Sequence, residues 1–256
     1  MKVLIVGYGF VGSAVGSIFT EKEQIIIDPK LNDNKISDYK LKFFDAVFVA
    51  VDTPQSDNFQ LLDSVLAELN EYMVPGTPVC CKSTATPEFY ESADARYGNL
   101  RLLHSPEYLN KSNPIQMFQE QKFFIIGGEK DAADRVASIF RERLKKVEDF
   151  YITDIKTAAL VKYAENFFLS VRVTFFNEMF LAHQQQGCKS TYDEFAQMLG
   201  MDQRIGHSHN KVPGADGKFG WSSHCLDKDA YMLEQFTQGK LVKFIRELNQ
   251  EHRSRE

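Results

Sequence analysis

Hydrophobic positions over the first 150 residues alternate between short apolar runs and longer stretches with helical spacing. The clearest run, residues 44–51, is apolar on both faces of a strand, as is typical of parallel strands that helices cover on both sides. Because runs and helical stretches alternate, the pattern predicts right-handed crossovers and a doubly wound α/β domain with a parallel sheet over residues 1–152. The strands are expected at residues 3–6, 24–27, 44–51, 78–82, 100–104 and 123–126, and the helices at 11–19, 61–72, 87–97 and 131–144.

The pattern changes after Tyr151, and residues 153–256 are expected to form an all-α domain. Residues 155–186 contain no Gly or Pro and predict one long helix whose apolar residues spread around more than one face. Such a helix must be covered on most sides, so we expect a homodimer through it; burial against the first domain is the alternative. Further helices are expected at residues 191–199 and from about 226 to 248, separated by a long loop at 200–223.

Composition narrows the function classes. The chain of 256 residues has 30 basic and 35 acidic residues and a net charge of −5, which argues against a binder of nucleic acid or anionic membrane. No apolar run is long enough to span a bilayer, and the first residues lack the layout of a signal peptide. Four cysteines are too few for a disulfide scaffold. These features predict a cytoplasmic enzyme.

A glycine pattern, Gly7-Tyr8-Gly9-Phe10-Val11-Gly12, follows the first strand and opens the first helix. In a Rossmann-type domain these glycines allow a tight turn, the approach of a pyrophosphate and close helix–strand packing. Asp28 ends the second strand, where a carboxylate accepts hydrogen bonds from a ribose 2′-hydroxyl. This pairing favours NAD over NADP as the cofactor, because a 2′-phosphate would repel the carboxylate. An accidental glycine-rich turn is the alternative.

Polar groups in the second half suggest covalent chemistry. Lys162 and Asn166 are four residues apart on the long helix and share a face, although each could also be structural. Cys225 lies where the long loop meets a helix, a position that favours a thiolate; a buried inert cysteine is the alternative. Cys80, Cys81 and Cys188 fit the buried, inert role better. No metal is expected, since the neighbouring histidines and Cys225 match no common zinc spacing.

Seven further stretches, taken in order, make the chain resemble the UDP-glucose/GDP-mannose dehydrogenase family. The resemblance covers essentially the whole chain and includes the glycine pattern. It implies two successive NAD-dependent oxidations that convert the C6 alcohol of a nucleotide sugar to a carboxylate. The stretches are residues 48–54, 82–84, 105–109, 162–166, 202–206, 212–214 and 225–229.

The resemblance also implies roles for single residues. Cys225 would trap the aldehyde as a thiohemiacetal and then hold a thioester, while Lys162 and Asn166 would stabilise the oxyanion. Glu107 would be a general acid/base, and Thr84 and Asp229 would position the hydrolytic water. The implied cofactor residues are Gly7, Gly9, Phe10, Val11, Gly12, Asp28, Val51, Thr53, Thr84 and Lys228. The implied substrate residues are Glu107, Tyr108, Leu109, Lys162, Asn166, Gly220 and Arg204, the last reaching the neighbouring subunit's substrate.

Three departures from the family pattern leave alternatives open. Ser222 and Ser223 replace two glycines, which would be strained if those positions need a positive φ. Lys111 replaces a glutamate. We also expect the chain to lack the family's third, Rossmann-like domain, unless another chain supplies it. The alternatives to a nucleotide-sugar dehydrogenase are a non-catalytic NAD-binding partner subunit and a β-hydroxyacid-type dehydrogenase.

Overall fold

The computed structural model describes residues 1–54, 59–109 and 112–255. The chain forms two compact units, residues 1–162 and 163–256, which are described separately. The sheet ends at residue 153, close to the boundary predicted at residues 152 and 153, but the first turns of the following helix belong to the first unit. The predicted roles of the two domains remain predictions.

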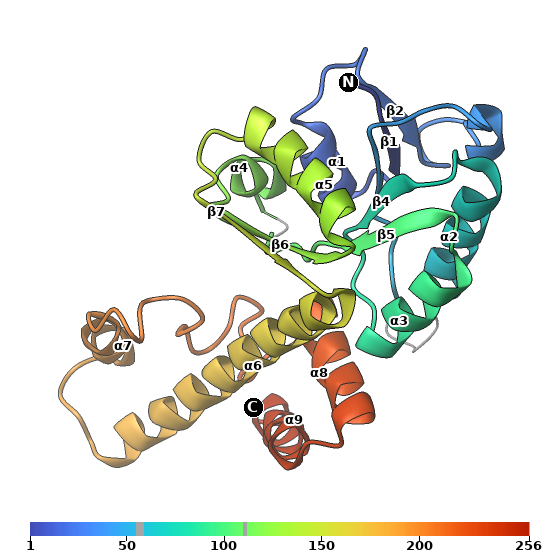
Figure 1. Cartoon of the computed structure of the whole chain (residues 1–256). Helices are drawn as coiled ribbons and strands as arrows, with labels where there is room; N and C mark the ends of the chain where they lie inside the picture. The colour runs from blue at the N-terminus through green and yellow to red at the C-terminus, as the bar shows by residue number, and fades with distance from the viewer. Residues whose placement is uncertain (55–58, 110–111, 256) are drawn as a thin grey trace. The chain divides into compact units, whose positions relative to one another are not determined.

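The described part of the first unit contains one seven-stranded sheet with the strand order β2-β1-β3-β4-β5-β6-β7 (Figure 1). The strands are β1 (Val3–Val6), β2 (Gln24–Ile27), β3 (Ala46–Val49), β4 (Thr77–Cys81), β5 (Leu100–His104), β6 (Phe123–Gly128) and β7 (Asp149–Thr153). The helices are α1 (Phe10–Gly16), the 3-10 helix η1 (Ile36–Tyr39), α2 (Gln60–Tyr72), α3 (Pro87–Arg96), α4 (Pro114–Gln119) and α5 (Lys130–Arg143).

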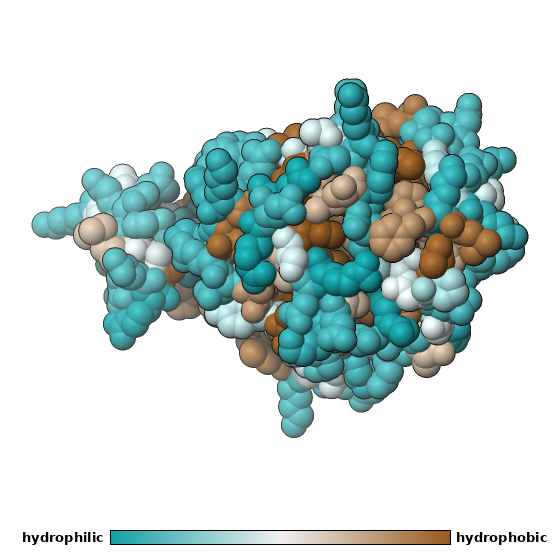
Figure 2. Space-filling view, turned by 45° about the horizontal axis from the view of Figure 1, so that its top comes forward, coloured by the Kyte–Doolittle hydropathy of each residue, from teal (hydrophilic) through white to brown (hydrophobic). Residues whose placement is uncertain are grey.

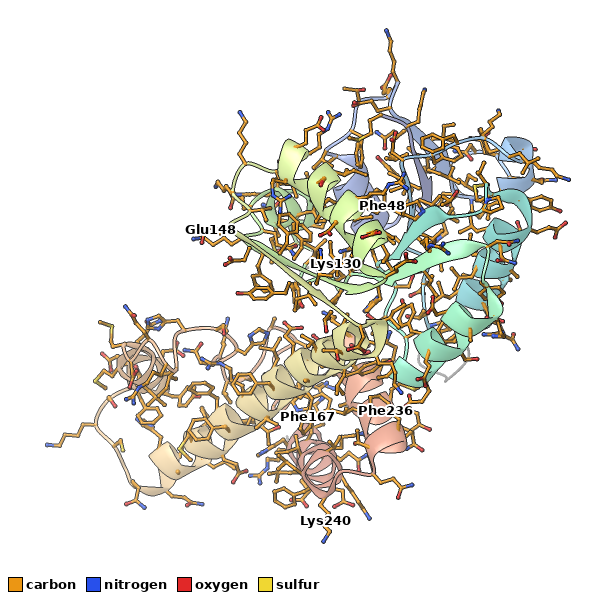
Figure 3. All side chains as sticks on the ribbon, viewed as in Figure 1. Phe48, Lys130, Glu148, Phe167, Phe236 and Lys240 are labelled. Atoms are coloured by element: carbon orange, nitrogen blue, oxygen red, sulfur yellow. The ribbon has the colours of Figure 1, made fainter. Side chains whose placement is uncertain are left out.

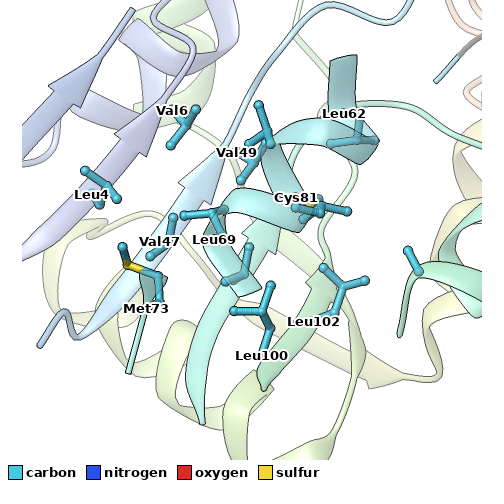
Figure 4. Packing of buried hydrophobic residues seen from close by; sticks show 14 of the residues in the cluster. Leu4, Val6, Val47, Val49, Leu62, Leu69, Met73, Cys81, Leu100 and Leu102 are labelled. Atoms are coloured by element: carbon cyan, nitrogen blue, oxygen red, sulfur yellow. The ribbon is translucent and has the colours of Figure 1, made fainter. Parts of the chain in front are cut away.

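Helices cover both faces of this sheet, as the apolar runs predict. Successive residues of a strand point to opposite faces, so β3 sends Val47 to one core and Phe48 to the other. The core on the Val47 side includes side chains of α2 and α3 and is drawn in Figure 4. The core on the Phe48 side includes side chains of α1, α4 and α5. The doubly wound α/β fold is therefore confirmed.

The sheet departs from the all-parallel prediction at one pair of strands. β5 and β6 are antiparallel, with Leu103 opposite Gly128 and His104 opposite Gly127, while the other pairs are parallel. Because β6 is antiparallel to β5, its first residue lies at the same edge of the sheet as the last residue of β5. This reversal keeps the segment that follows His104 at the carboxyl edge of the central strands.

The second unit is helical. Helix α6 (Ile155–Gln185) begins in the first unit and continues into the second, followed by α7 (Tyr192–Gly200), α8 (His224–Thr237) and α9 (Lys240–Arg253). The single helix expected from about 226 to 248 is wrong, because Gln238 adopts a left-handed φ of 50° and separates α8 from α9. The loop expected at 200–223 is present after Gly200.

Aromatic residues pack the helices of the second unit together (Figure 3). Phe167 of α6 packs with Trp221 and with Ile245 of α9, and Phe236 of α8 lies 5.1 Å from the ring of Tyr163. In Figure 2, hydrophilic residues cover most of the visible face, with apolar residues in smaller patches between them. None of the helices in the described residues is long and apolar enough to cross a membrane.

Candidate active site

The three glycines of the first loop differ in the space that a side chain would find. Gly7 has a φ of +84°, and a Cβ there would lie 2.6 Å from the carbonyl oxygen of Ala50. A Cβ at Gly12 would lie 2.0 Å from the carbonyl oxygen of Gly7, so α1 packs too closely for any side chain. At Gly9 a Cβ would meet no atom within 4 Å, and the φ of −69° suits any residue. The protein leaves the space over Gly9 open, which fits the approach of a pyrophosphate to the backbone.

Asp28 lies beside this loop. Its Oδ2 accepts a hydrogen bond of 2.7 Å from the backbone N–H of Tyr8, and its Oδ1 accepts one of 2.9 Å from the N–H of Lys30. A carboxylate has about four acceptor positions, so these two bonds orient it and leave capacity for a ribose hydroxyl. The orientation of Asp28 fits the predicted NAD site.

The other predicted cofactor residues of the first unit follow neighbouring parallel strands. Val51 and Thr53 follow β3, and Thr84 follows β4 beside Ser83, whose hydroxyl donates a 2.7 Å hydrogen bond to the Val51 carbonyl. Carboxyl ends of parallel strands meet at one edge of a sheet, which is where dinucleotides bind in such folds. The residues at this edge are Gly7, Gly9, Phe10, Val11, Gly12, Asp28, Val51, Thr53 and Thr84.

Lys162 and Glu107 form a buried pair in the first unit. The Lys162 Nζ donates a 2.6 Å hydrogen bond to the backbone oxygen of Glu107 and lies 3.7 Å from its Oε1. The N–H of Leu109 donates to Glu107 Oε2 at 2.7 Å, and the Tyr108 ring lies 5.4 Å from Lys162 Nζ. The structure thus brings together four of the predicted substrate residues, of which Lys162 supplies a cation and Glu107 a carboxylate.

Lys82 contacts the residues that precede Glu107. The sequence analysis assigned no role to it. Its side chain is 2% exposed, and its Nζ donates to Ser105 Oγ at 3.1 Å and to the Pro106 carbonyl at 3.3 Å. Burial lowers the pKa of Lys82 to about 8, because a charged amine is less stable away from water. Lys82 therefore supports the segment that carries Glu107. The signals in the sequence were the position of Lys82 at the end of an apolar strand and in the family-like stretch 82–84.

Asn166 and Asp229 are bonded to each other in the second unit, and Cys225 lies one helical turn before Asp229 on α8. The Asn166 Nδ2 donates a 2.5 Å hydrogen bond to Asp229 Oδ2, and Lys228 Nζ lies 3.5 Å from Asp229 Oδ1. Asn166, Lys228 and Asp229 are all buried, and Cys225 is half-buried in the first turn of α8. Because Cys225 precedes Asp229 by four residues, both project from one face of α8.

The two serines before Cys225 are not strained. Ser223 has an extended φ of −149°, and neither serine is among the residues with positive φ. Ser223 caps α8, because its Oγ accepts a 3.0 Å hydrogen bond from the N–H of Leu226. Asp227 Oδ2 accepts bonds from the Ser223 N–H at 3.0 Å and the Ser222 Oγ at 3.3 Å. The expected strain of these replacements is therefore absent.

The other cysteines differ from Cys225. Cys80 and Cys81 are fully buried in β4, and burial raises the pKa of Cys80 to about 11 and holds the pKa of Cys81 well above its ordinary range. Cys188 is exposed, so its predicted burial is wrong. Among the described side chains, no three His, Cys, Asp or Glu residues are grouped as a metal site requires.

The remaining predicted substrate residues lie in the long loop. Arg204 is exposed and pairs with Asp202 of its own turn, with Nη2 to Oδ2 at 2.6 Å. Gly220 has a φ of +70°, and its N–H donates a 2.8 Å hydrogen bond to Asn177 Oδ1. Lys111 lies outside the described residues.

Comparison with known proteins identifies the family. Residues 30–144 match the NAD binding domain of the UDP-glucose/GDP-mannose dehydrogenase family, and residues 156–251 match its central domain. The chain belongs to this family of NAD-dependent oxidoreductases. NAD is thereby confirmed as the cofactor class, although the glycine loop and Asp28 precede the matched range.

Individual members of the dehydrogenase family are distant in sequence but similar in fold. UDP-glucose 6-dehydrogenase of Campylobacter jejuni is 25% identical over 98% of this chain and 72% of its own length. UDP-glucose 6-dehydrogenase of Rickettsia felis is 24% identical over 88% of this chain. The structure of UDP-D-ManNAc dehydrogenase from Pyrococcus horikoshii superposes with a TM-score of 0.81 at 21% identity, over 98% of this chain and 69% of that one.

The chain spans only part of these dehydrogenases. It covers 52% of the length of the Rickettsia felis relative. Within this chain, the matches are to the NAD binding domain and the central domain of the family. The fold and the cofactor class are therefore established. The substrate, the covalent mechanism and the roles of single residues are taken up as proposals.

Proposed function

We propose that the protein is an NAD-dependent nucleotide-sugar 6-dehydrogenase that oxidises UDP-glucose, or a related nucleotide sugar, to the uronate. The observation that carries the proposal is the cluster of Cys225, Asn166 and Asp229, with the Asn166–Asp229 hydrogen bond at 2.5 Å. A thiol, an amide donor and a carboxylate are the groups needed to trap an aldehyde, stabilise its oxyanion and hydrolyse a thioester.

The residues of the first loop fit NAD. The open space over Gly9 suits the pyrophosphate, and the oriented carboxylate of Asp28 suits the ribose hydroxyls. When bound, NAD supplies the hydride acceptor for each oxidation. The family resemblance assigns Lys228 to the cofactor as well.

The first oxidation prepares the carbon for the thiol. Glu107 accepts the proton of the C6 hydroxyl as the hydride leaves, which gives the aldehyde. The Cys225 thiolate then adds to C6, so that an S–C bond forms and the carbonyl oxygen becomes an oxyanion. The Lys162 ammonium and the Asn166 amide N–H donate to this oxyanion. The buried Lys162–Glu107 pair, with Nζ and Oε1 at 3.7 Å, supports this division of roles.

The second oxidation and hydrolysis complete the reaction. Loss of hydride from the thiohemiacetal leaves a thioester on Cys225. A water positioned by Thr84 and Asp229 attacks the thioester, the C–S bond breaks, and the thiolate leaves. In total, the alcohol and one water yield a carboxylate, two hydrides and three protons, so Cys225 is regenerated.

Assembly and location extend the proposal. A homodimer through α6 would cover the exposed side chains of Phe168 and Phe175, which are seven residues apart on one face of the helix. Arg204, whose side chain is 89% exposed, is assigned to the substrate of the neighbouring subunit. A cytoplasmic location agrees with four free cysteines.

Replacing the nucleophile tests the mechanism. We expect Cys225→Ser to lower NADH formation from UDP-glucose by at least about 100-fold, because a serine hydroxyl is not ionised at neutral pH. Absorbance at 340 nm measures turnover, and calorimetry is expected to show unchanged NAD binding. Cys188→Ser is the matched control, because Cys188 is an exposed cysteine outside the cluster, and it is expected to keep full activity.

Two results would replace the proposal. Full activity of Cys225→Ser would favour a β-hydroxyacid-type dehydrogenase, which needs no thiol. NAD binding without turnover of UDP-glucose, GDP-mannose or their N-acetyl relatives would favour a non-catalytic partner subunit.

A further inference from the structure

The segment that leads to Cys225 is fixed by buried side chains. Residues 220–223, which we call the pre-cysteine segment, connect the long loop to α8. Gly220 and Trp221 are buried, whereas Ser222 and Ser223 are exposed. The buried half of the segment is therefore where neighbouring elements can determine its position.

Asn249 of α9 is bonded to both backbone groups of Trp221 in this segment. Its Oδ1 accepts a 2.8 Å hydrogen bond from the Trp221 N–H, and its Nδ2 donates a 2.9 Å hydrogen bond to the Trp221 carbonyl. Asn249 itself is 6% exposed. One amide side chain thus satisfies both backbone groups of Trp221, which would be costly to bury without partners.

Neighbouring contacts leave the segment little freedom. Asn177 Oδ1 accepts the Gly220 N–H at 2.8 Å, and Thr174 Oγ1 accepts the Trp221 indole N–H at 3.0 Å. A Cβ at Gly220 would lie 2.5 Å from Asn249 Oδ1, so only glycine allows this approach. Asn249 lies at the centre of this arrangement because it contacts Trp221 and limits position 220.

The other end of the pre-cysteine segment is fixed by the helix cap. Ser223 Oγ accepts the Leu226 N–H, and Asp227 accepts the Ser223 N–H. Cys225 lies in the turn that this cap begins. Trp221, whose backbone is bonded to Asn249, is four residues before Cys225 and two residues before the Ser223 cap.

We infer that Asn249 is a positioning residue that holds the Cys225 thiol in place through the backbone of Trp221. This inference rests on the proposed function, in which Cys225 is the nucleophile. Misplacing a nucleophile by about 1 Å lowers a rate by about 100-fold, because reaction requires near-contact of the reacting atoms. Loosening the first turn would also weaken the stabilisation that a helix N-terminus gives a thiolate.

The test measures the thiol directly, in a Cys188→Ser background where Cys225 is the accessible cysteine. Iodoacetamide alkylates the thiolate with loss of iodide, and its rate is followed from pH 6 to 10. We expect Asn249→Ala to move the midpoint of this profile upward, towards the ordinary thiol value of about 8.5, and to lower kcat about 10- to 100-fold. Gln250→Ala, an exposed neighbour on α9, is the matched control and is expected to change neither quantity.

A second variant distinguishes a positioning role of Asn249 from a role in folding. The alkylation assay also tests this role independently of the proposed function. Asn249→Asp keeps the size and the acceptor for the Trp221 N–H, so an intermediate shift in this variant supports the inference even where Asn249→Ala does not fold. Alkylation needs no substrate, so the profile decides the role of Asn249 even if no nucleotide sugar is turned over. A folded Asn249→Ala protein with the parent's alkylation midpoint and kcat would overturn the inference.

Discussion

At the scale of single residues, the glycine loop separates structural from binding requirements. Gly12 is required by the fold, because a Cβ would lie 2.0 Å from a backbone oxygen that cannot move away. Gly9 has no such neighbour, and its backbone is ordinary. The same substitution by alanine should therefore lower the stability of the protein at Gly12 and the affinity for NAD at Gly9.

We predict that Gly12→Ala destabilises the protein by on the order of 3 kcal/mol, since overpacking against backbone forces a shift of α1. The melting temperature should fall by roughly 6–12 °C. Gly9→Ala should leave the melting temperature within about 2 °C but weaken NAD binding at least about tenfold, or about 1.4 kcal/mol. Thermal unfolding and calorimetry measure the two quantities. Equal loss of stability in both variants would show that Gly9 is structural as well.

The sequence predicted residues that belong to motifs and missed those that act alone. Cys225, Lys162 and Asn166 were singled out because their residue types suit chemistry and their positions follow helix boundaries and spacing. Lys82 lies in the family-like stretch 82–84 but received no role, and Asn249 was not singled out, because a lone buried polar residue has no pattern along the chain. Its role comes from partners far away in sequence, such as Ser105 for Lys82 and Trp221 for Asn249.

At the scale of elements, the central strands were predictable because buried strands carry continuous apolar runs. The strand β7 was missed, since it is an edge strand whose residues are only partly buried. The short helix α4 was missed because six residues are too few for periodicity. The strand β6 was predicted, but its antiparallel direction was not, because strand direction depends on the route of the connecting segment, which no apolar pattern records.

The break between α8 and α9 gives a prediction for a single element. Gln238 has a φ of 50°, a conformation that is costly for residues with a Cβ. Gln238→Gly should stabilise the protein by about 0.5–1 kcal/mol, because glycine adopts this C-cap conformation without that cost. Gln250→Gly, inside α9, is the control and should destabilise by about 1 kcal/mol. Urea unfolding measures both, and a loss of stability in Gln238→Gly would contradict the prediction.

At the scale of the whole molecule, α6 is more apolar than its own unit can cover. Phe176 is buried, but Phe168 is 62% exposed and Phe175 is 45% exposed. Exposed aromatic residues repeated on one helix face are typical of an interface. The sequence suggested a second subunit because apolar residues spread around more than one face of the helix, and the structure shows that Phe168 and Phe175 are the exposed aromatic residues of α6.

We predict a dimer of twice 29.3 kDa in light scattering, and a monomer for Phe168→Asp. A buried unpaired carboxylate in the interface would cost several kcal/mol, which exceeds what such an interface can lose. Phe244→Asp on α9 is the control, because Phe244 is 58% exposed but lies off α6, and it should remain a dimer. A monomeric parent protein, or a dimeric Phe168→Asp variant, would exclude this interface.

The position of Asn249 has a consequence for biosynthesis. Translation proceeds from the N-terminus, so Cys225 is added to the growing chain 249 − 225 = 24 residues before the side chain that bonds to Trp221. The partners on α6, Asn177 and Thr174, are therefore already present when Cys225 is added, whereas Asn249 is not. If Asn249 positions Cys225 as we propose, the thiol reaches its final position only after α9 has been made.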